Sequence, residues 1–287
     1  METRVKGTEK EVIIGHGLPT VIIGERINPA ANKKLNQALT EGGDFEEIVR
    51  NEASTQVGLG ADMIDVNVSA FGVDEVSLLP KAVAAAQAVV DVPLCIDSNN
   101  PNAIAAALKV YKGKPLVNSV SGEIPSITKV IPMIKEYGAA VVGLVQDDEG
   151  VPKDADRRLV VANNILETAL KAGIPREDVL IDCLAFAVGA DTDSGPEVLK
   201  AIQRVRDELG LNQTLGASNI SFGLPDREVL NTAFLPMIVE KGVTCLITSA
   251  RKAIPIVRGI DLILARDKRA RRYMEAYRMR AAAKKQD

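Results

Sequence analysis

The stretch VIIGERIN, residues 21–28, is an apolar, β-branched run that ends in an acid and an amide. A strand buried on both faces should be almost continuously apolar, so polar residues at its carboxyl end need a particular reason. The same pattern recurs downstream, with helix-like segments between most of the runs. The further runs are MIDVNVS (63–69), PLCIDSNN (93–100), PLVNSVS (115–121), AAVVGLVQDD (139–148), VLIDCLAF (179–186), TLGASNIS (214–221) and TCLITSA (244–250).

An eight-stranded α/β barrel gives that reason, because its active site is built at the carboxyl ends of the strands. The intervening segments begin like helices: Asp44 is placed to cap a helix that runs to about Val57, and Asp74 to start the next one. We therefore predict an α/β fold, a single-domain (β/α)8 TIM barrel. The polar strand-end residues that one cavity would receive are Glu25, Asn28, Asp65, Asn67, Asp97, Asn118, Gln146, Asp147, Asp182, Ser218, Asn219 and Thr248.

Two segments flank the predicted barrel, which spans residues 21–265. Residues 1–20 are predicted to form a hairpin or arm, in which the β-branched runs of VIIGHGLPTVII (12–23) flank a Gly-Pro turn. Residues 266–287 form a helix-prone end with nine Lys or Arg against three acids. This basic helix or tail is either a solvated surface or a docking surface for an acidic partner. No nucleic-acid recognition motif accompanies the charge.

Composition excludes several classes of protein. The chain has no apolar run long enough for a membrane helix, and its first residues lack a signal-peptide core. Three cysteines, Cys95, Cys183 and Cys245, lie inside predicted strands, as expected of core residues in a reducing cytoplasm. The single histidine, His16, leaves no His-rich metal site, and Ser-His-Asp catalysis only if His16 is the base. Neither a phosphate loop nor GxGxxG after the first strand is present.

The predicted cavity is rich in carboxylates and amides, without clustered Arg or Lys and without metal-ligand spacing. A carboxylate accepts two hydrogen bonds from a ring N–H and an adjacent amino group, and an amide offers one donor and one acceptor. Such a cavity suits a flat heterocycle such as a pterin or a purine. We expect no tightly bound metal.

Six motifs carry a resemblance to a known family. GERIN (24–28), DVN (65–67), CIDS (95–98), VNS (117–119), IDCL (181–184) and GASNIS (216–221) stand in order on consecutive predicted strands. Together they resemble the pterin-binding methyltransferases, which include methyltetrahydrofolate:corrinoid protein methyltransferases and the folate module of cobalamin-dependent methionine synthase.

The resemblance implies a role for each matched residue. Asp97, Asn118 and Asp182 match residues that bind the pterin ring, and Asp65 and Asn67 match polar residues of the same pocket. Asn219 matches the catalytic amide that reaches N5 of tetrahydrofolate. The remaining matches are Gly216 and Ser218 beside that amide, Arg227 near the folate opening, and Glu25 and Asn28 in a supporting role. Phe222 stands where members carry a second polar residue, so the loop after the seventh strand departs from the pattern.

Simpler interpretations stay open for some of these residues. Asn118 and Asp182 are also suited to cap helices, and Asn28 precedes Pro29 and is suited to a turn. Asp147 and Asp148 read as a solvated loop.

The resemblance implies a methyltransferase that moves a methyl group between N5 of tetrahydrofolate, or 5-methyltetrahydrofolate, and the cobalt of a corrinoid (cobalamin). It implies that a partner corrinoid protein supplies the corrinoid, and it implies a homodimer. The direction of transfer is left open. Two alternatives remain: a pterin transferase resembling dihydropteroate synthase, which needs basic residues for phosphates such as Arg251 and Lys252, and a non-catalytic folate-binding subunit.

Overall fold

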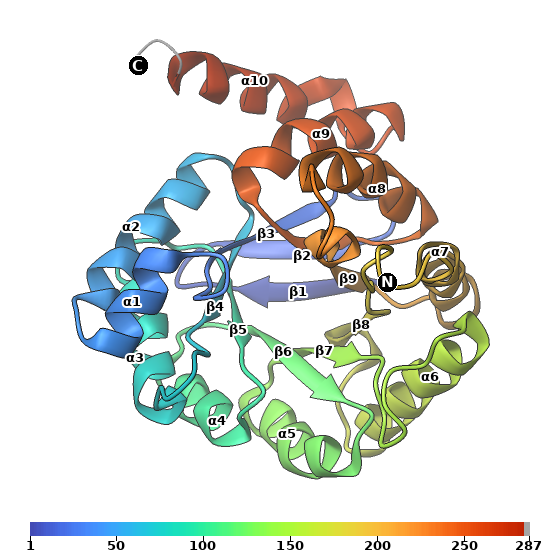
Figure 1. Cartoon of the computed structure of the whole chain (residues 1–287), viewed down its shortest axis with the longest axis horizontal. Helices are drawn as coiled ribbons and strands as arrows, with labels where there is room; N and C mark the ends of the chain where they lie inside the picture. The colour runs from blue at the N-terminus through green and yellow to red at the C-terminus, as the bar shows by residue number, and fades with distance from the viewer. Residues whose placement is uncertain (284–287) are drawn as a thin grey trace.

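The computed structural model, described here for residues 1–283, is a closed barrel of parallel strands with helices around it (Figure 1). Strand β10 pairs with both β9 and β3, which closes the ring. The predicted TIM barrel is therefore confirmed, with every predicted run forming a strand. The barrel strands are β3 (Val21–Ile27), β4 (Met63–Asn67), β5 (Leu94–Asp97), β6 (Leu116–Ser121), β7 (Ala140–Leu144), β8 (Val179–Asp182), β9 (Gln213–Gly216) and β10 (Cys245–Thr248).

Helices connect successive strands and pack against the outside of the barrel. Asp44 and Asp74 cap α2 and α3 through their side chains, as the sequence predicts, because their carboxylates accept the free N–H groups of the first turn. Helix α1, which precedes α2, has its own cap in Asn32 and was not predicted. The main helices are α1 (Lys33–Glu41), α2 (Phe45–Gly58), α3 (Glu75–Gln87), α4 (Pro101–Val110), α5 (Ile124–Tyr137), α6 (Ala155–Lys171), α7 (Ser194–Arg204), α8 (Arg227–Lys241), α9 (Ala250–Ile263) and α10 (Arg271–Ala283).

Short helical turns complete the connections. They are η1 (Arg176–Asp178), the π-turn η2 (Val205–Leu209), η3 (Ala217–Ser221) and η4 (Lys268–Ala270). Of these, η3 matters most for the site, because it directly follows the carboxyl end of β9.

Two separate apolar clusters hold the barrel together. The large cluster lies between the outer faces of the strands and the helices, and the small one fills the barrel interior. Met63, Cys95 and Leu116 belong to the interior cluster and are fully buried. The three cysteines are free and buried, as predicted.

An N-terminal hairpin closes the amino-terminal end of the barrel. Strands β1 (Glu2–Lys6) and β2 (Glu11–Gly15) pair antiparallel, and their Val5 and Ile14 side chains join the interior cluster. The predicted hairpin is thus present, but its predicted pairing is wrong. The Gly-Pro segment leads from β2 into β3 instead of joining two paired strands, because the run at 21–23 pairs within the barrel.

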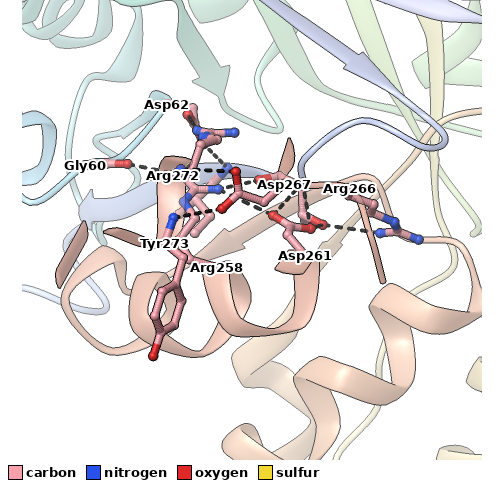
Figure 2. Close-up of polar contacts among 10 residues, drawn as sticks. Gly60, Asp62, Arg258, Asp261, Arg266, Asp267, Arg272 and Tyr273 are labelled. Carbon is pink, nitrogen blue, oxygen red and sulfur yellow. Dashed lines mark hydrogen bonds and ion pairs between the residues drawn. The ribbon is translucent and has the colours of Figure 1, made fainter. Parts of the chain in front are cut away.

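Helix α10 lies outside the ring of helices, beside α9 (Figure 1). Asp62 accepts hydrogen bonds from Arg272 of α10 and from Arg258 of α9, the latter at 2.9 Å (Figure 2). Asp267 accepts from the backbone N–H of Arg272 and of Tyr273 at the start of α10. Part of the basic segment is therefore anchored by ion pairs; its last four residues lie outside the described part of the chain. No helix in the described residues meets the length and hydropathy needed to cross a membrane.

Candidate functional site

The candidate site lies at the carboxyl ends of the strands, on the faces that point into the barrel. Side chains alternate between the two faces of a strand, so positions two apart share a face. In β4 the interior residue Met63 is followed on that face by Asp65 and then by Asn67. The structure therefore brings several of the predicted polar residues together at one mouth. By the same alternation the interior faces of other strands end in Glu25, Asp97, Asn118, Asp182 and Gly216.

Three neighbouring strands present a row of polar side chains. Asn67 is in register with Asp97, and Asp97 with Asn118, across β4, β5 and β6. Burial raises the pKa of Asp97 to about 6, while a hydrogen bond from the Asn67 side chain acts in the opposite direction. At neutral pH the row therefore offers a carboxylate between two amides.

Asp65 lies one layer deeper than this row and is completely buried. Within residues 1–283, neither of its two carboxylate oxygens has a hydrogen-bond partner. Burial, followed by the charge of Asp97, raises its pKa well above the usual range. Buried polar groups are normally paired, so this carboxyl is a group that a ligand donor or a bound proton would satisfy.

Glu25 lies on β3, which pairs with β4 and so stands beside the row. Its Oε1 lies 3.4 Å from the hydroxyl of Ser218, which follows β9. Burial raises the pKa of Glu25 to about 7, whereas the Ser218 hydrogen bond and the Arg227 charge lower it. Glu25 therefore changes its charge close to neutral pH.

Asp182 ends β8 and is supported by backbone and by a buried arginine. Its Oδ1 accepts a 2.7 Å hydrogen bond from the N–H of Leu184, and burial raises its pKa to about 6. Arg158 of α6 donates to the carbonyls of Cys183 and Leu184, both at 3.0 Å, and so fixes the chain that follows Asp182. Sequence reasoning missed Arg158, although an arginine on the apolar side of an amphipathic helix signals a buried partner.

The turn η3 positions Asn219 at the rim. A Cβ on Gly216 would stand 3.0 Å from the Asn219 amide nitrogen, so a glycine leaves room for that amide. Arg227 donates to the Ser218 carbonyl at 2.9 Å and stacks on Phe222, with 4.6 Å between the guanidinium carbon and the ring centre. Arg227 thus holds the turn that carries Asn219.

Other predicted residues make local contacts. Asn28 accepts a 2.9 Å hydrogen bond from the N–H of Ala30, the turn role that its Pro29 neighbour suggested. Asp147 forms a 2.8 Å ion pair with Arg157. His16 lies in the N-terminal segment, where its Nε2 is 3.0 Å from the Leu211 carbonyl, so it is not placed as a base at the mouth.

Two cavities border the polar cluster. One, of about 640 Å³, opens between α1, α2 and the start of α9, and Glu25 is one of its lining residues. The other, of about 420 Å³, is lined by the rim beyond β5, β6 and β7, including Asn99, Ser119 and Gln146. Neither cavity is centred on the row at Asp97, so each one borders the polar cluster from one side.

The chemistry of this mouth is that of hydrogen-bond acceptors. Across residues 1–283 no three His, Cys, Asp or Glu side chains are grouped as metal ligands. Buried carboxylates need donors from elsewhere, and a ring with several N–H groups offers them in one plane.

Comparison with known proteins gives the family of the chain. Residues 24–249 match the sequence profile of the family described as pterin binding enzyme, and the chain belongs to that family. It is 28% identical over 263 residues to a methylcorrinoid:tetrahydrofolate methyltransferase of Eubacterium limosum, covering 90% of this chain and 96% of the relative. It is 32% identical over 255 residues to a methionine synthase of Mycobacterium leprae, covering 84% of this chain but only 21% of that protein.

Solved structures share the fold. A dihydropteroate synthase from Xanthomonas albilineans in complex with 7,8-dihydropteroate superimposes with a TM-score of 0.69 at 20% identity, covering 88% of this chain and 96% of that one. A Yersinia pestis dihydropteroate synthase with a pterin-sulfa conjugate gives a TM-score of 0.68 at 16% identity, covering 87% and 94%. At these identities the likeness speaks for the barrel alone.

Proposed function

We propose that this pterin-binding enzyme transfers a methyl group between N5 of tetrahydrofolate and the cobalt of a corrinoid carried by a separate protein. The observation that carries the proposal is the in-register row of Asn67, Asp97 and Asn118, with Asn219 beyond the end of β9. In the closed ring, β9 stands opposite β5. One flat ring between them would meet carboxylate and amide on one side and a neutral amide on the other.

The first step is recognition of the ring. The pyrimidine edge of a reduced pterin carries an amino group, ring N–H groups and a carbonyl. Asp97 and Asp182 accept from its donors, while Asn118 can both accept and donate. These carboxyls have raised pKa values because they are buried, and the ring donors would favour their charged forms.

The second step concerns N5. A methyl group leaves a tertiary amine readily only when positive charge or a hydrogen bond develops at that nitrogen. The amide of Asn219 is neutral and can turn either its oxygen or its N–H₂ toward N5, so it serves both protonation states. A placed dipole of this kind contributes about 2.7–4 kcal/mol to transition-state stabilisation. The corrinoid cobalt supplies the methyl acceptor or donor, and the same residues serve both directions.

The third step is access for the partner. Loops at the mouth expose large aromatic side chains: Phe71 follows β4, Phe186 follows β8, and Phe222 follows η3. Exposed aromatic residues are enriched at protein-protein interfaces. Their position around the mouth supports delivery of the corrinoid by a second protein.

The test is turnover of methylcobalamin with tetrahydrofolate. The wild-type chain should form 5-methyltetrahydrofolate, and Asn219→Ala should lower the single-turnover rate by about 10²- to 10³-fold, with a much smaller effect on folate affinity. Asn99→Ala, at an exposed amide on the same rim, is the matched control. A wild-type rate in the Asn219 variant at saturating substrates would make Asn219 a positioning residue.

A transferase of the dihydropteroate synthase type is the second candidate, favoured by Arg251 and Lys252 after β10. Lys252 forms a 2.6 Å ion pair with Glu228. Of the two basic residues, Arg251 is therefore the one without an ion pair within the described residues. One cation is a weak clamp for a diphosphate. Formation of dihydropteroate from a pterin diphosphate and p-aminobenzoate would establish this activity, and folate binding without either turnover would indicate a non-catalytic subunit.

Two properties of the native protein belong to the same proposal. A homodimer follows from the resemblance, and analytical ultracentrifugation checks it. A cytoplasmic location follows from three buried, unpaired cysteines.

A further inference from the structure

The cavity of about 640 Å³ beside the strand ends has no part in recognition of the ring. Its walls come from α1, α2 and the first turn of α9, so it opens at the rim of the barrel between β3 and β10. Glu25 borders this cavity and also contacts Ser218 next to Asn219. The cavity therefore borders the candidate site at Glu25.

Three cations line the cavity, and two of them are unengaged. Arg26 lies 3.6 Å from the carboxylate of Glu52 and also donates to a backbone carbonyl. Neither the Lys34 ammonium nor the Arg251 guanidinium makes a hydrogen bond or ion pair with any residue in the range 1–283. The cavity therefore has positive charge available for an anionic ligand.

Uncharged donors point to the same kind of ligand. Gln56 is 3% exposed; its Oε1 accepts from the Arg26 N–H at 3.0 Å, but its Nε2 has no partner within the described chain. Helix α9 begins at the cavity, and the side chain of its N-cap, Ser249, makes no capping hydrogen bond. A buried amide donor and an uncapped helix N-terminus both favour a negatively charged oxygen.

The orientation of the ring gives the direction of the rest of the ligand. If β5, β6 and β8 bind the pyrimidine edge of the pterin, the C6 substituent leaves from the opposite edge. In the closed ring, β10 stands opposite β6, and β3 opposite β7. The substituent then leaves toward β10 and β3, where the cavity opens.

We propose that this cavity binds the carboxylates of the γ-glutamyl tail of the folate, so that the enzyme prefers polyglutamylated over monoglutamylated tetrahydrofolate. This inference rests on the proposed folate chemistry of the strand ends. Each added γ-linked glutamate brings one more carboxylate, and Lys34 and Arg251 supply two charges for them. The pKa of Glu25, raised to about 7 by burial, reduces the repulsion that a fixed charge there would exert on the tail.

The experiment is calorimetry with three ligands: 6-methyltetrahydropterin, which has no tail, tetrahydrofolate monoglutamate, and its triglutamate. In the wild-type chain the triglutamate should bind at least about tenfold more tightly than the monoglutamate, with a preference that declines as salt rises. In Lys34→Gln/Arg251→Gln this preference should fall to about twofold or less, while the affinity for 6-methyltetrahydropterin stays at the wild-type value. Lys129→Gln, an exposed lysine on the cavity beyond β6, should retain the preference.

The outcomes separate this proposal from the proposed function. Equal affinity for the monoglutamate and the triglutamate in wild type, or a preference that survives the double substitution, overturns the tail site, even when the bare pterin binds. Displacement of the triglutamate by micromolar inorganic pyrophosphate would instead make the cavity a diphosphate site and overturn the glutamyl assignment. Absence of binding by all three ligands would reject the folate chemistry itself.

Discussion

The buried carboxyl groups of the candidate site are expected to lower the stability of the empty protein and to strengthen the binding of a ligand. Asp97 and Asp182 have raised pKa values because burial disfavours their charged forms. Their charge is useful only when a ligand donates hydrogen bonds to it. In sites of this kind the empty protein is less stable and the ligand binds more tightly. Both effects can be measured by substituting single residues.

The first prediction concerns these two aspartates. Asp97→Asn and Asp182→Asn should each weaken tetrahydrofolate binding by about 1.5–3 kcal/mol, roughly 10- to 150-fold, because one charge-assisted hydrogen bond is lost. The same substitutions should raise the melting temperature of the empty protein. Asp148→Asn, at an exposed carboxylate on the loop after β7, should change neither. Unchanged folate affinity in both site variants would place the ring elsewhere.

The second prediction concerns Glu25 and pH. Its folded pKa of about 7 lies above the usual 4.5, so the folded state binds more protons between these values, and stability falls as pH rises through that window. Glu25→Gln should therefore melt at a higher temperature than wild type at pH 8, with the difference shrinking toward pH 4.5. Glu9→Gln, at an exposed glutamate of the hairpin turn, is the control. A difference that is constant with pH would mean that Glu25 is not titrating there.

At the scale of elements, the hairpin β1–β2 acts as the floor of the barrel. Val5 and Ile14 are fully buried in the interior cluster, while Ile13 on the opposite face of β2 is only half-buried. Asn212 holds the hairpin in place by donating to the Ile14 carbonyl at 2.9 Å and to the Thr3 hydroxyl at 3.0 Å. The floor therefore belongs to the core of the barrel.

The third prediction follows from that floor. Ile14→Ala should lower the free energy of unfolding by about 2–5 kcal/mol, because it opens a cavity in a closed interior. Ile13→Ala should cost clearly less, since that side chain is only half-buried. Denaturant unfolding of both variants makes the comparison. Equal losses would mean that the hairpin packs on the barrel without closing it.

The helices and strands also show which parts of the fold and of the candidate site could be predicted from the sequence. Each barrel strand was predictable because a buried parallel strand is apolar along its whole length, and the polar ends marked one edge. The pairing within the hairpin was not predictable, because β2 is fixed by contacts such as Asn212, roughly 200 residues away. The strand-end residues could be predicted from alternation. The cavity at Lys34 and Arg251 could not, because its walls come from helices at opposite ends of the chain.

At the scale of the whole molecule, the two ends of the barrel differ in chemistry. The amino-terminal end is closed by the hairpin, and Asp62, Arg258 and Arg272 tie α9 and α10 together near it (Figure 2). The carboxyl-terminal end is open, polar and rimmed by exposed aromatic side chains. Ligand binding at the open end should therefore stabilise the fold without rearranging the closed end.

The fourth prediction is a ligand-dependent shift in melting temperature that needs no metal. Tetrahydrofolate at about 100 times its dissociation constant should stabilise the folded state by about 2.7 kcal/mol, which corresponds to a rise in melting temperature of roughly 4–5 °C. The rise should be the same before and after treatment with a chelator, because the proposed hydrogen-bond partners of the ring are carboxylates and amides of the chain. In Asp182→Asn the rise at the same folate concentration should be smaller, since fewer molecules are occupied. Differential scanning calorimetry measures all three, and loss of the rise after chelation alone would show that binding runs through a metal ion.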